Sequence, residues 1–199
     1  PDVSVPVICD MSSDILSRPV DVKKFSLIYA GAQKNLGPAG VVIVIVKKAF
    51  LETARTDLPP MLSYQNYADN DSLYNTPPVF AIYMVNKTLH WINAQGGVKA
   101  IAARNREKAQ LIYNVIDASR GFYRGHAEKA SRSLMNITFN LPTQELEKDF
   151  IAEGKKRGFI GIGGHRLVGG CRVSAYNAVT PEACRALADF MKEYQAKHE

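Results

Sequence analysis

One uninterrupted run of branched apolar residues limits the folds open to this chain. Residues 41–46 read Val-Val-Ile-Val-Ile-Val, directly after the Gly-rich stretch 37–40. β-Branched side chains favour extended backbone, and a run without polar alternation is typical of a strand covered on both faces. Two shorter apolar runs, 5–9 and 25–30, precede it and are separated by a polar turn. Strands joined by polar and Gly-rich loops predict an α/β fold.

Helical patterns dominate the middle of the chain. Thr76-Pro77-Pro78 predicts a helix start with Thr76 as N-cap, and the apolar segment behind it runs to about residue 94. Between residues 98 and 119, apolar side chains recur at helical spacing, with Lys and Arg on the opposite face. Gly96-Gly97 separates the two helices. We therefore predict two domains, residues 1–95 and 96–199.

The second half of the chain alternates between strand and helix patterns. We expect a strand at 134–141, a helix at about 143–157, and strand pieces at 159–162 and 171–176. A final helix begins at Thr180-Pro181-Glu182. The spacing of its apolar residues predicts a buried face made of Ala183, Leu187, Phe190, Met191 and Tyr194.

Composition narrows the class of protein. The chain has 199 residues, 46% of them hydrophobic, which is enough for a packed core. No apolar run approaches the roughly 20 residues that cross a bilayer, so no membrane span is expected. Cys9, Cys171 and Cys184 lack C-x-x-C spacing, which indicates reduced thiols in a cytosolic protein. The net charge of +6 suits an anionic ligand, but the basic residues are scattered and form no nucleic-acid reader motif.

Two charged residues stand where strands are expected to end. Asp10 follows the first apolar run, and Lys34 lies on the loop between the next two. Ligands of open α/β sheets bind outside the carboxyl ends of strands, so both side chains could face one site. Pyridoxal phosphate chemistry needs a carboxylate for the ring nitrogen and an amine for a Schiff base. A turn-forming Asp and a solvated Lys are the commoner explanation of such a pair, which therefore needs support.

That support comes from the residues around the pair. Three blocks of sequence, in order, closely resemble the phosphoserine aminotransferase family, which belongs to the class V aminotransferases of fold type I. The first block contains Cys9-Asp10-Met11-Ser12-Ser13, Ser17-Arg18-Pro19, Tyr29-Ala30-Gly31-Ala32-Gln33-Lys34-Asn35 and Gly37-Pro38-Ala39-Gly40. The second is Leu73-Tyr74-Asn75-Thr76-Pro77-Pro78, and the third comprises Gly164-His165-Arg166, Gly169-Gly170, Arg172, Ser174 and Tyr176-Asn177-Ala178.

The resemblance assigns the cofactor, pyridoxal 5'-phosphate, to named residues. It implies that Asp10 pairs with the pyridinium nitrogen, Gln33 bonds the phosphate and Lys34 forms the Schiff base. It also implies a homodimer, in which Asn75 and Thr76 bind the phosphate of the cofactor held by the neighbouring subunit. A helix N-terminus at Thr76 would offer unpaired N–H groups to that phosphate. Plain helix capping is the alternative for these two residues.

The third block is implied to bind the substrate. Arg172 would hold the α-carboxylate, because a guanidinium matches a carboxylate with two parallel hydrogen bonds. His165 and Arg166 would meet the distal phosphate or carboxylate. The alternative is a hairpin or loop, flanked by the glycine pairs, that carries exposed basic residues. No metal ligand set is expected.

The family's activity follows from the resemblance. It implies transfer of the amino group of phosphoserine to 2-oxoglutarate, which yields 3-phosphohydroxypyruvate and glutamate, in cytoplasmic serine biosynthesis. Asp10 and Lys34 would be the catalytic residues. Residues 1–95 would be the C-terminal part of a large domain, with a mainly parallel sheet and flanking helices, and 96–199 a smaller α/β domain. The family's N-terminal half is absent from this sequence, so we expect a fragment with weak or no activity alone.

Two other interpretations stay open. The chain could belong to another class V enzyme, a small-amino-acid aminotransferase or a cysteine desulfurase. Gln33 argues against a desulfurase, since those enzymes place His before the Schiff-base Lys and need a Cys on a mobile loop. The chain could also be a non-catalytic fragment that mediates subunit contact or binds anions through its basic surface. Trapping of a cofactor adduct on Lys34 would distinguish an enzyme of this class from a non-catalytic fragment, which should form none.

Overall fold

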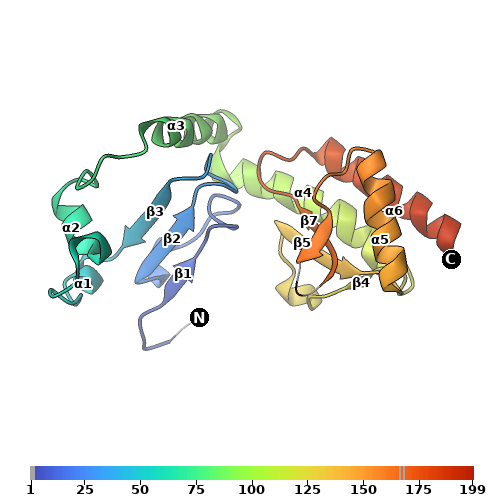
Figure 1. Ribbon diagram of the computed structural model, residues 1–199, viewed down its shortest axis with the longest axis horizontal. Helices are drawn as coiled ribbons and strands as arrows, with labels where there is room; N and C mark the ends of the chain where they lie inside the picture. The colour runs from blue at the N-terminus through green and yellow to red at the C-terminus, as the bar shows by residue number, and fades with distance from the viewer. Residues whose placement is uncertain (1–2, 166, 168) are drawn as a thin grey trace. The chain divides into compact units, whose positions relative to one another are not determined.

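The computed structural model describes residues 3–165, 167 and 169–199, and divides the chain into two compact units. Unit 1 comprises Pro1–Gln95 and unit 2 comprises Gly96–Glu199. Each has its own sheet and helices, so strands and helices mix in both (Figure 1). The α/β class expected from the sequence is confirmed.

A three-stranded sheet forms the centre of unit 1. The strand order is β1 (Ile8–Asp10), β2 (Leu27–Gly31) and β3 (Val42–Val46), and Figure 1 shows the three side by side. β1 runs parallel to β2, whereas β3 is antiparallel to it. The other elements of the unit are short, except the last: η1 (Val22–Lys24), α1 (Lys48–Leu51), η2 (Pro60–Leu62), α2 (Tyr64–Asp69) and α3 (Val79–Ala94).

The core of unit 1 lies on one face of this sheet. Apolar side chains of β2 meet those of α3 and of the segments that follow β1 and β2. The helix contributes Val85, which is only 7% exposed. The buried members of this cluster are Met11, Ile28, Ala30, Ala32, Leu36 and Val85.

Two expectations for the strands of unit 1 are wrong. The run 41–46 was expected to be covered on both faces, but Val42 is 61% and Ile45 42% exposed. Among the described residues, β3 pairs with β2 alone, so it lies at an edge of the sheet. The first strand begins at Ile8, not at residue 5, and Ile8 itself is largely exposed. An apolar run reveals which residues could be buried, but not whether a partner covers them.

The start of α3 also differs from expectation. The helix begins at Val79 with Pro78 as its N-cap residue, and no side chain caps it. Thr76 lies outside the helix. The ring of a proline disfavours helical backbone in the residue before it, and Thr76 precedes Pro77, which in turn precedes Pro78. The helix therefore cannot extend back to Thr76.

Unit 2 combines an antiparallel sheet with three long helices. Its strand order is β4 (Arg124–Gly125), β5 (Asn136–Asn140), β7 (Gly169–Ser174) and β6 (Gly163–His165). The helices are α4 (Gly97–Ala118), α5 (Gln144–Lys156) and α6 (Pro181–His198), together with the short η3 (Lys129–Ser131) (Figure 1). Within the described residues, no helix has both the length and the apolar character needed to cross a membrane.

Aromatic rings fill the core of unit 2. Phe150 of α5 stacks on Phe190 of α6 with ring centroids 5.0 Å apart, and Tyr123 packs edge-on against Phe139 of β5. Such contacts add to the burial of large apolar surfaces, and they join both helices to the sheet. The buried face predicted for the last helix is confirmed at Leu187, Phe190, Met191 and Tyr194, but Ala183 is exposed.

The helix starts expected in unit 2 agree with the structure, whereas one expected strand does not. The side chain of Thr143 caps α5 and that of Thr180 caps α6, with Pro181 in the first turn. Residues 159–162 form no strand, and the strand in this region is Gly163–His165. Gly161, inside the expected strand, has φ +76°, a left-handed conformation far from that of regular extended backbone.

Candidate functional site

Asp10 stands at the end of β1, where the chain turns. Its Oδ1 accepts hydrogen bonds from the Ser12 N–H (2.8 Å) and from the Ser12 hydroxyl (2.6 Å). These bonds lower the pKa of Asp10, the hydroxyl most, and hydrogen bonding from Tyr29 and the charge of Lys34 lower it further. Partial desolvation acts in the opposite direction. The carboxylate is thus held in its ionised form.

Lys34 lies on a tight loop after β2. The N–H groups of Leu36 and Gly37 both donate to the Ala32 carbonyl, and the Ala32 N–H donates to Val41. Leu36 is 1% exposed and belongs to the core cluster, whereas Gln33 and Lys34 are exposed. The loop is anchored by its apolar side chain and presents its polar ones.

The two segments meet at one end of the sheet. β1 and β2 are parallel neighbours, so their carboxyl ends share an edge, and Asp10 pairs in register with Tyr29. The charge of Lys34 acts on Asp10. The structure thus brings the carboxylate and the amine of the sequence prediction close to each other. The roles assigned to them stay predictions.

Two side chains that the sequence analysis passed over join these segments. The hydroxyl of Ser12 accepts a hydrogen bond from the Gly31 N–H (2.9 Å). The buried side chain of Asn35, next to Lys34, donates to the carbonyls of Ile15 (3.1 Å) and Ser13 (3.4 Å). Both residues stand within the motifs quoted above, and their position beside Asp10 and Lys34 was the signal that could have identified them.

Asn75 and Thr76 lie on the segment between α2 and α3, and both are exposed. The Asn75 side chain donates to the Thr76 carbonyl (3.2 Å). Asn75 also lines a cavity of about 590 Å³, whose wall includes alternate residues of β3, among them Val44, and tyrosines of α2. Val44 pairs with Tyr29, and Tyr29 with Asp10, so Val44 and Asp10 project from the same face of the sheet.

The predicted substrate residues belong to unit 2. His165 ends β6 and is exposed, with Nδ1 accepting a hydrogen bond from the Leu167 N–H (3.2 Å). Arg166 lies outside the described residues. Arg172 is half-buried in β7, and its Nε is buried without a hydrogen-bond partner in the part of the chain that the structure describes. A buried guanidinium nitrogen without a partner is costly unless an acceptor reaches it.

The glycines of this block are required by close backbone approach. A Cβ on Gly164 would lie 1.9 Å from the Gly169 carbonyl oxygen, closer than any contact permits. Gly170 has φ +70°, and its N–H donates to Oε2 of Glu147 (3.2 Å). The other oxygen of Glu147 accepts from the side-chain amide of Asn140 (2.9 Å). Strands β6 and β7 thus pair closely, and the two strands carry His165 and Arg172.

A buried lysine anchors the far end of β7. The Nζ of Lys108, on α4, donates to the carbonyls of Ala175 (3.0 Å) and Tyr176 (2.8 Å). Burial lowers the pKa of Lys108 to about 8. One turn earlier on α4, the amide of Asn105 donates to the Asn177 side chain (2.8 Å). These bonds hold the segment that directly follows the Arg172 strand.

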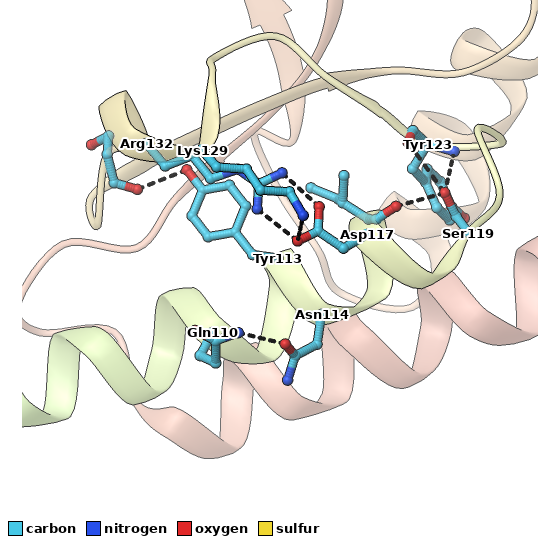
Figure 2. Close-up of polar contacts among 10 residues, drawn as sticks. Gln110, Tyr113, Asn114, Asp117, Ser119, Tyr123, Lys129 and Arg132 are labelled. Carbon is cyan, nitrogen blue, oxygen red and sulfur yellow. Dashed lines mark hydrogen bonds and ion pairs between the residues drawn. The ribbon is translucent and has the colours of Figure 1, made fainter.

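A network of charged side chains lies on the other side of α4. Figure 2 shows Arg132 and Lys129 converging on Asp117. Arg132 binds Asp117 through two parallel hydrogen bonds (2.9 and 2.6 Å) and lies over the Tyr113 ring. The Arg132 hydrogen bonds lower the pKa of Asp117 to about 2. Both cations contact the same carboxylate, so this network joins α4 to the η3 segment.

This chain is similar to known aminotransferases over nearly its whole length. The model of the class-V aminotransferase family matches residues 2–187. A phosphoserine aminotransferase of Lysinibacillus sphaericus is 59% identical over 98% of this chain and 54% of its own length. The phosphoserine aminotransferase structure from Bacillus circulans subsp. alkalophilus superimposes with a TM-score of 0.96 at 54% identity, over 100% of this chain and 55% of that one. The crystal structure of PLP-bound phosphoserine aminotransferase from Trichomonas vaginalis gives a TM-score of 0.91 at 40% identity, over 96% and 55%. The chain therefore spans about half the length of the curated relatives it matches.

Proposed function

The chain belongs to the class-V aminotransferase family, and from that premise we propose that it is the C-terminal part of a phosphoserine aminotransferase. The reaction is amino transfer from phosphoserine to 2-oxoglutarate, a step of serine biosynthesis. Residues 1–95 are assigned to the large domain and 96–199 to the small one. The observation that carries the proposal is the meeting of Asp10 and Lys34 at the ends of neighbouring parallel strands.

The donor set of unit 1 fits pyridoxal phosphate. This cofactor, when bound, supplies an electron sink for the bonds of the substrate α-carbon. A carboxylate with a lowered pKa suits the ring nitrogen, and the nearby amine of Lys34 suits the aldehyde carbon. The exposed amide of Gln33, on the same loop, is assigned to the phosphate. Residues of one short loop and one strand end thus account for contacts to the ring nitrogen, the aldehyde carbon and the phosphate.

Lys34 is assigned the proton transfers. Its Nζ would hold the aldehyde carbon of the cofactor, and as a free amine it would move the proton of the substrate α-carbon. Asp10 keeps the ring nitrogen protonated throughout. The same two groups act in reverse when the keto acid accepts the amino group, so the amine begins and ends the cycle in one protonation state.

Unit 2 is assigned the substrate anion. The buried Nε of Arg172, which lacks a partner among the described residues, supports contact with the α-carboxylate. His165 at the end of β6 and Arg166, outside the described residues, are assigned to the distal phosphate. A phosphorylated substrate offers the second anionic group that such residues need.

A homodimer is part of the proposal. Large apolar side chains of unit 1 are exposed, including Leu62 (68%), Leu73 (63%) and Phe80 (72%). Exposed apolar surface of this extent commonly marks an interface. Asn75 and Thr76 belong to the same stretch of chain, which supports their assignment to the cofactor phosphate of the neighbouring subunit. A second copy of this chain would cover both the exposed apolar side chains and the segment that carries Asn75 and Thr76.

The cysteines support an aminotransferase over a cysteine desulfurase. Burial raises the pKa of the thiols of Cys9 and Cys184, and raises that of Cys171 to about 12. A nucleophilic cysteine needs a lowered pKa and access to the substrate. All three thiols are free, which also supports a reducing compartment, for which we propose the cytoplasm.

Borohydride trapping tests the proposal. The chain is incubated with pyridoxal phosphate and reduced, and the modified peptide is identified by mass spectrometry. The adduct should form at Lys34, be lost in Lys34→Ala and persist in Lys47→Ala, which removes an exposed lysine elsewhere in unit 1. Phosphoserine should suppress trapping more strongly than alanine or cysteine. Adducts spread evenly over the surface lysines would refute the assignment.

A further inference from the structure

One hydroxyl bridges the two segments that carry the cofactor residues. The Oγ of Ser12 lies 2.6 Å from Oδ1 of Asp10 and 2.9 Å from the backbone nitrogen of Gly31. A backbone N–H can only donate, so the hydroxyl accepts from Gly31 and its single proton points to Asp10. The direction of both bonds is therefore fixed.

On the Asp10 side, Ser12 immobilises one carboxylate oxygen. Its backbone N–H donates to the same Oδ1 (2.8 Å), the local turn typical of Asp followed by a polar residue. With Oδ1 held by two donors of one residue, rotation of the carboxyl group would break both bonds. Oδ2 is then the oxygen that we assign to the ring nitrogen. The Ser12 hydroxyl is also the largest influence on the pKa of Asp10.

On the other side, Ser12 holds the residue from which the Lys34 loop departs. Gly31 is the last residue of β2 and pairs with Val42 of β3. The Gln33 side chain folds back over it, since a Cβ on Gly31 would lie 2.7 Å from Oε1 of Gln33. The hydroxyl thus supports the part of the loop that presents Gln33 and Lys34.

The turn does not depend on this hydroxyl for its fold. The Met11 N–H donates to the Tyr29 carbonyl (2.8 Å), and the N–H groups of Asp14 and Ile15 donate back to Met11 (3.0 and 2.8 Å). The Asn35 side chain ties the same turn to the Lys34 loop. Loss of the hydroxyl should leave the backbone in place and remove one of the two Ser12 donors that hold the Asp10 carboxylate.

We propose that Ser12 is a positioning residue of this site, whose hydroxyl holds the Asp10 carboxylate and the start of the Lys34 loop in one fixed arrangement. The role rests on the proposed function, because Asp10 and Lys34 gain their chemical meaning from the cofactor. Ser12 acts through the two groups that it joins.

Two measurements on the cofactor-free chain test the bridge. Carboxyl NMR gives the pKa of Asp10, and amide hydrogen exchange gives the protection of Gly31. In Ser12→Ala the pKa should rise by about one unit, because a bond to the charged form is lost, and Gly31 exchange should accelerate roughly tenfold. Ser12→Thr, which keeps a hydroxyl, should restore both. Ser13→Ala, which keeps the carbonyl that Asn35 uses, should change neither.

Cofactor trapping at Lys34 tests the positioning. In Ser12→Ala, half-maximal formation of the adduct should need roughly tenfold more pyridoxal phosphate, because one hydrogen bond to a charged group is lost. In Ser12→Thr and Ser13→Ala, the concentration needed should stay near that of the parent chain. Unchanged pKa and exchange in Ser12→Ala would refute the bridge. Altered values with unchanged trapping would make the hydroxyl merely structural. If the parent chain itself forms no adduct at Lys34, the proposed function fails and the positioning role with it, while the cofactor-free measurements still decide the bridge.

Discussion

The buried amine of Lys108 lies 2.8 Å from the carbonyl oxygen of Tyr176, just beyond the strand that carries Arg172. A second carbonyl, that of Ala175, accepts from the same amine at 3.0 Å. A lysine on the middle of α4 therefore fixes the connection between β7 and α6. Removal of its charge or its hydrogen bonds should change the stability of unit 2.

The lowered pKa of Lys108 predicts a pH-dependent stability. Its pKa is about 8 in the folded chain, below the ordinary value of 10.5, so the unfolded chain binds the proton more tightly. Below pH 8 the buried charge costs stability, and this cost disappears as the pH rises from 8 to 10.5. The unfolding free energy of the parent chain relative to Lys108→Met should therefore increase over that range, by at most about 1.4 kcal/mol per pH unit.

Denaturant unfolding at several pH values measures this difference. The exposed Lys99 lies on the same helix, and Lys99→Met should show no such trend relative to the parent chain. A difference between the parent chain and Lys108→Met that stays constant with pH would contradict the prediction.

Neighbouring glycines of the β6–β7 strand pair should respond differently to the same substitution. In Gly164→Ala the new Cβ would collide with the Gly169 carbonyl, so the two strands must separate, at a cost of roughly 3 kcal/mol or more. In Gly163→Ala the nearest atom is Cδ1 of Ile151 at 3.6 Å, an ordinary contact, and the change should stay within about 0.5 kcal/mol. Thermal unfolding of the two variants compares them, and equal losses would show that the strands are not so closely spaced.

The position of Thr76 outside α3 predicts that its side chain adds little to helix stability. Thr180, by contrast, caps α6 by accepting a hydrogen bond from the Ala183 N–H (3.2 Å). Thr180→Ala should therefore lower the unfolding free energy by about 1 kcal/mol, while Thr76→Ala changes it by less than about 0.5 kcal/mol. A loss in Thr76→Ala as large as in Thr180→Ala would place the start of α3 earlier than Val79.

Asp117 predicts a loss of stability in acid. Its pKa is lowered to about 2 by Arg132, so the folded chain prefers the ionised form more than the unfolded chain does. The stabilisation is present above the ordinary pKa of 3.8 and is lost as the pH falls towards 2. The advantage of the parent chain over Asp117→Asn should shrink over this range. Asp189→Asn, which removes an exposed partner of Lys192, serves as the control.

Several features of the molecule could be read from local sequence. The helices at 97–118, 144–156 and 181–198 agree with their apolar spacing and with the Thr caps of the last two, because these signals act between residues one or two turns apart. Asp10 and Lys34 were also recognisable, because strand ends and the motifs around them are local. Errors arose where two prolines displaced the start of α3 and where Gly161 prevented a strand.

The sequence by itself determined the α/β class and most helices, and it singled out the residues to which we assign the chemistry. Only the tertiary structure revealed the contacts that hold these residues, such as Ser12 to Gly31, 19 residues away, and Glu147 to Gly170, 23 residues away. It also decided that Val42 and Ile45, which project from opposite faces of β3, stay largely exposed. The physical reason is that a polar side chain on a turn can bond many partners, and only the packing of distant segments selects one.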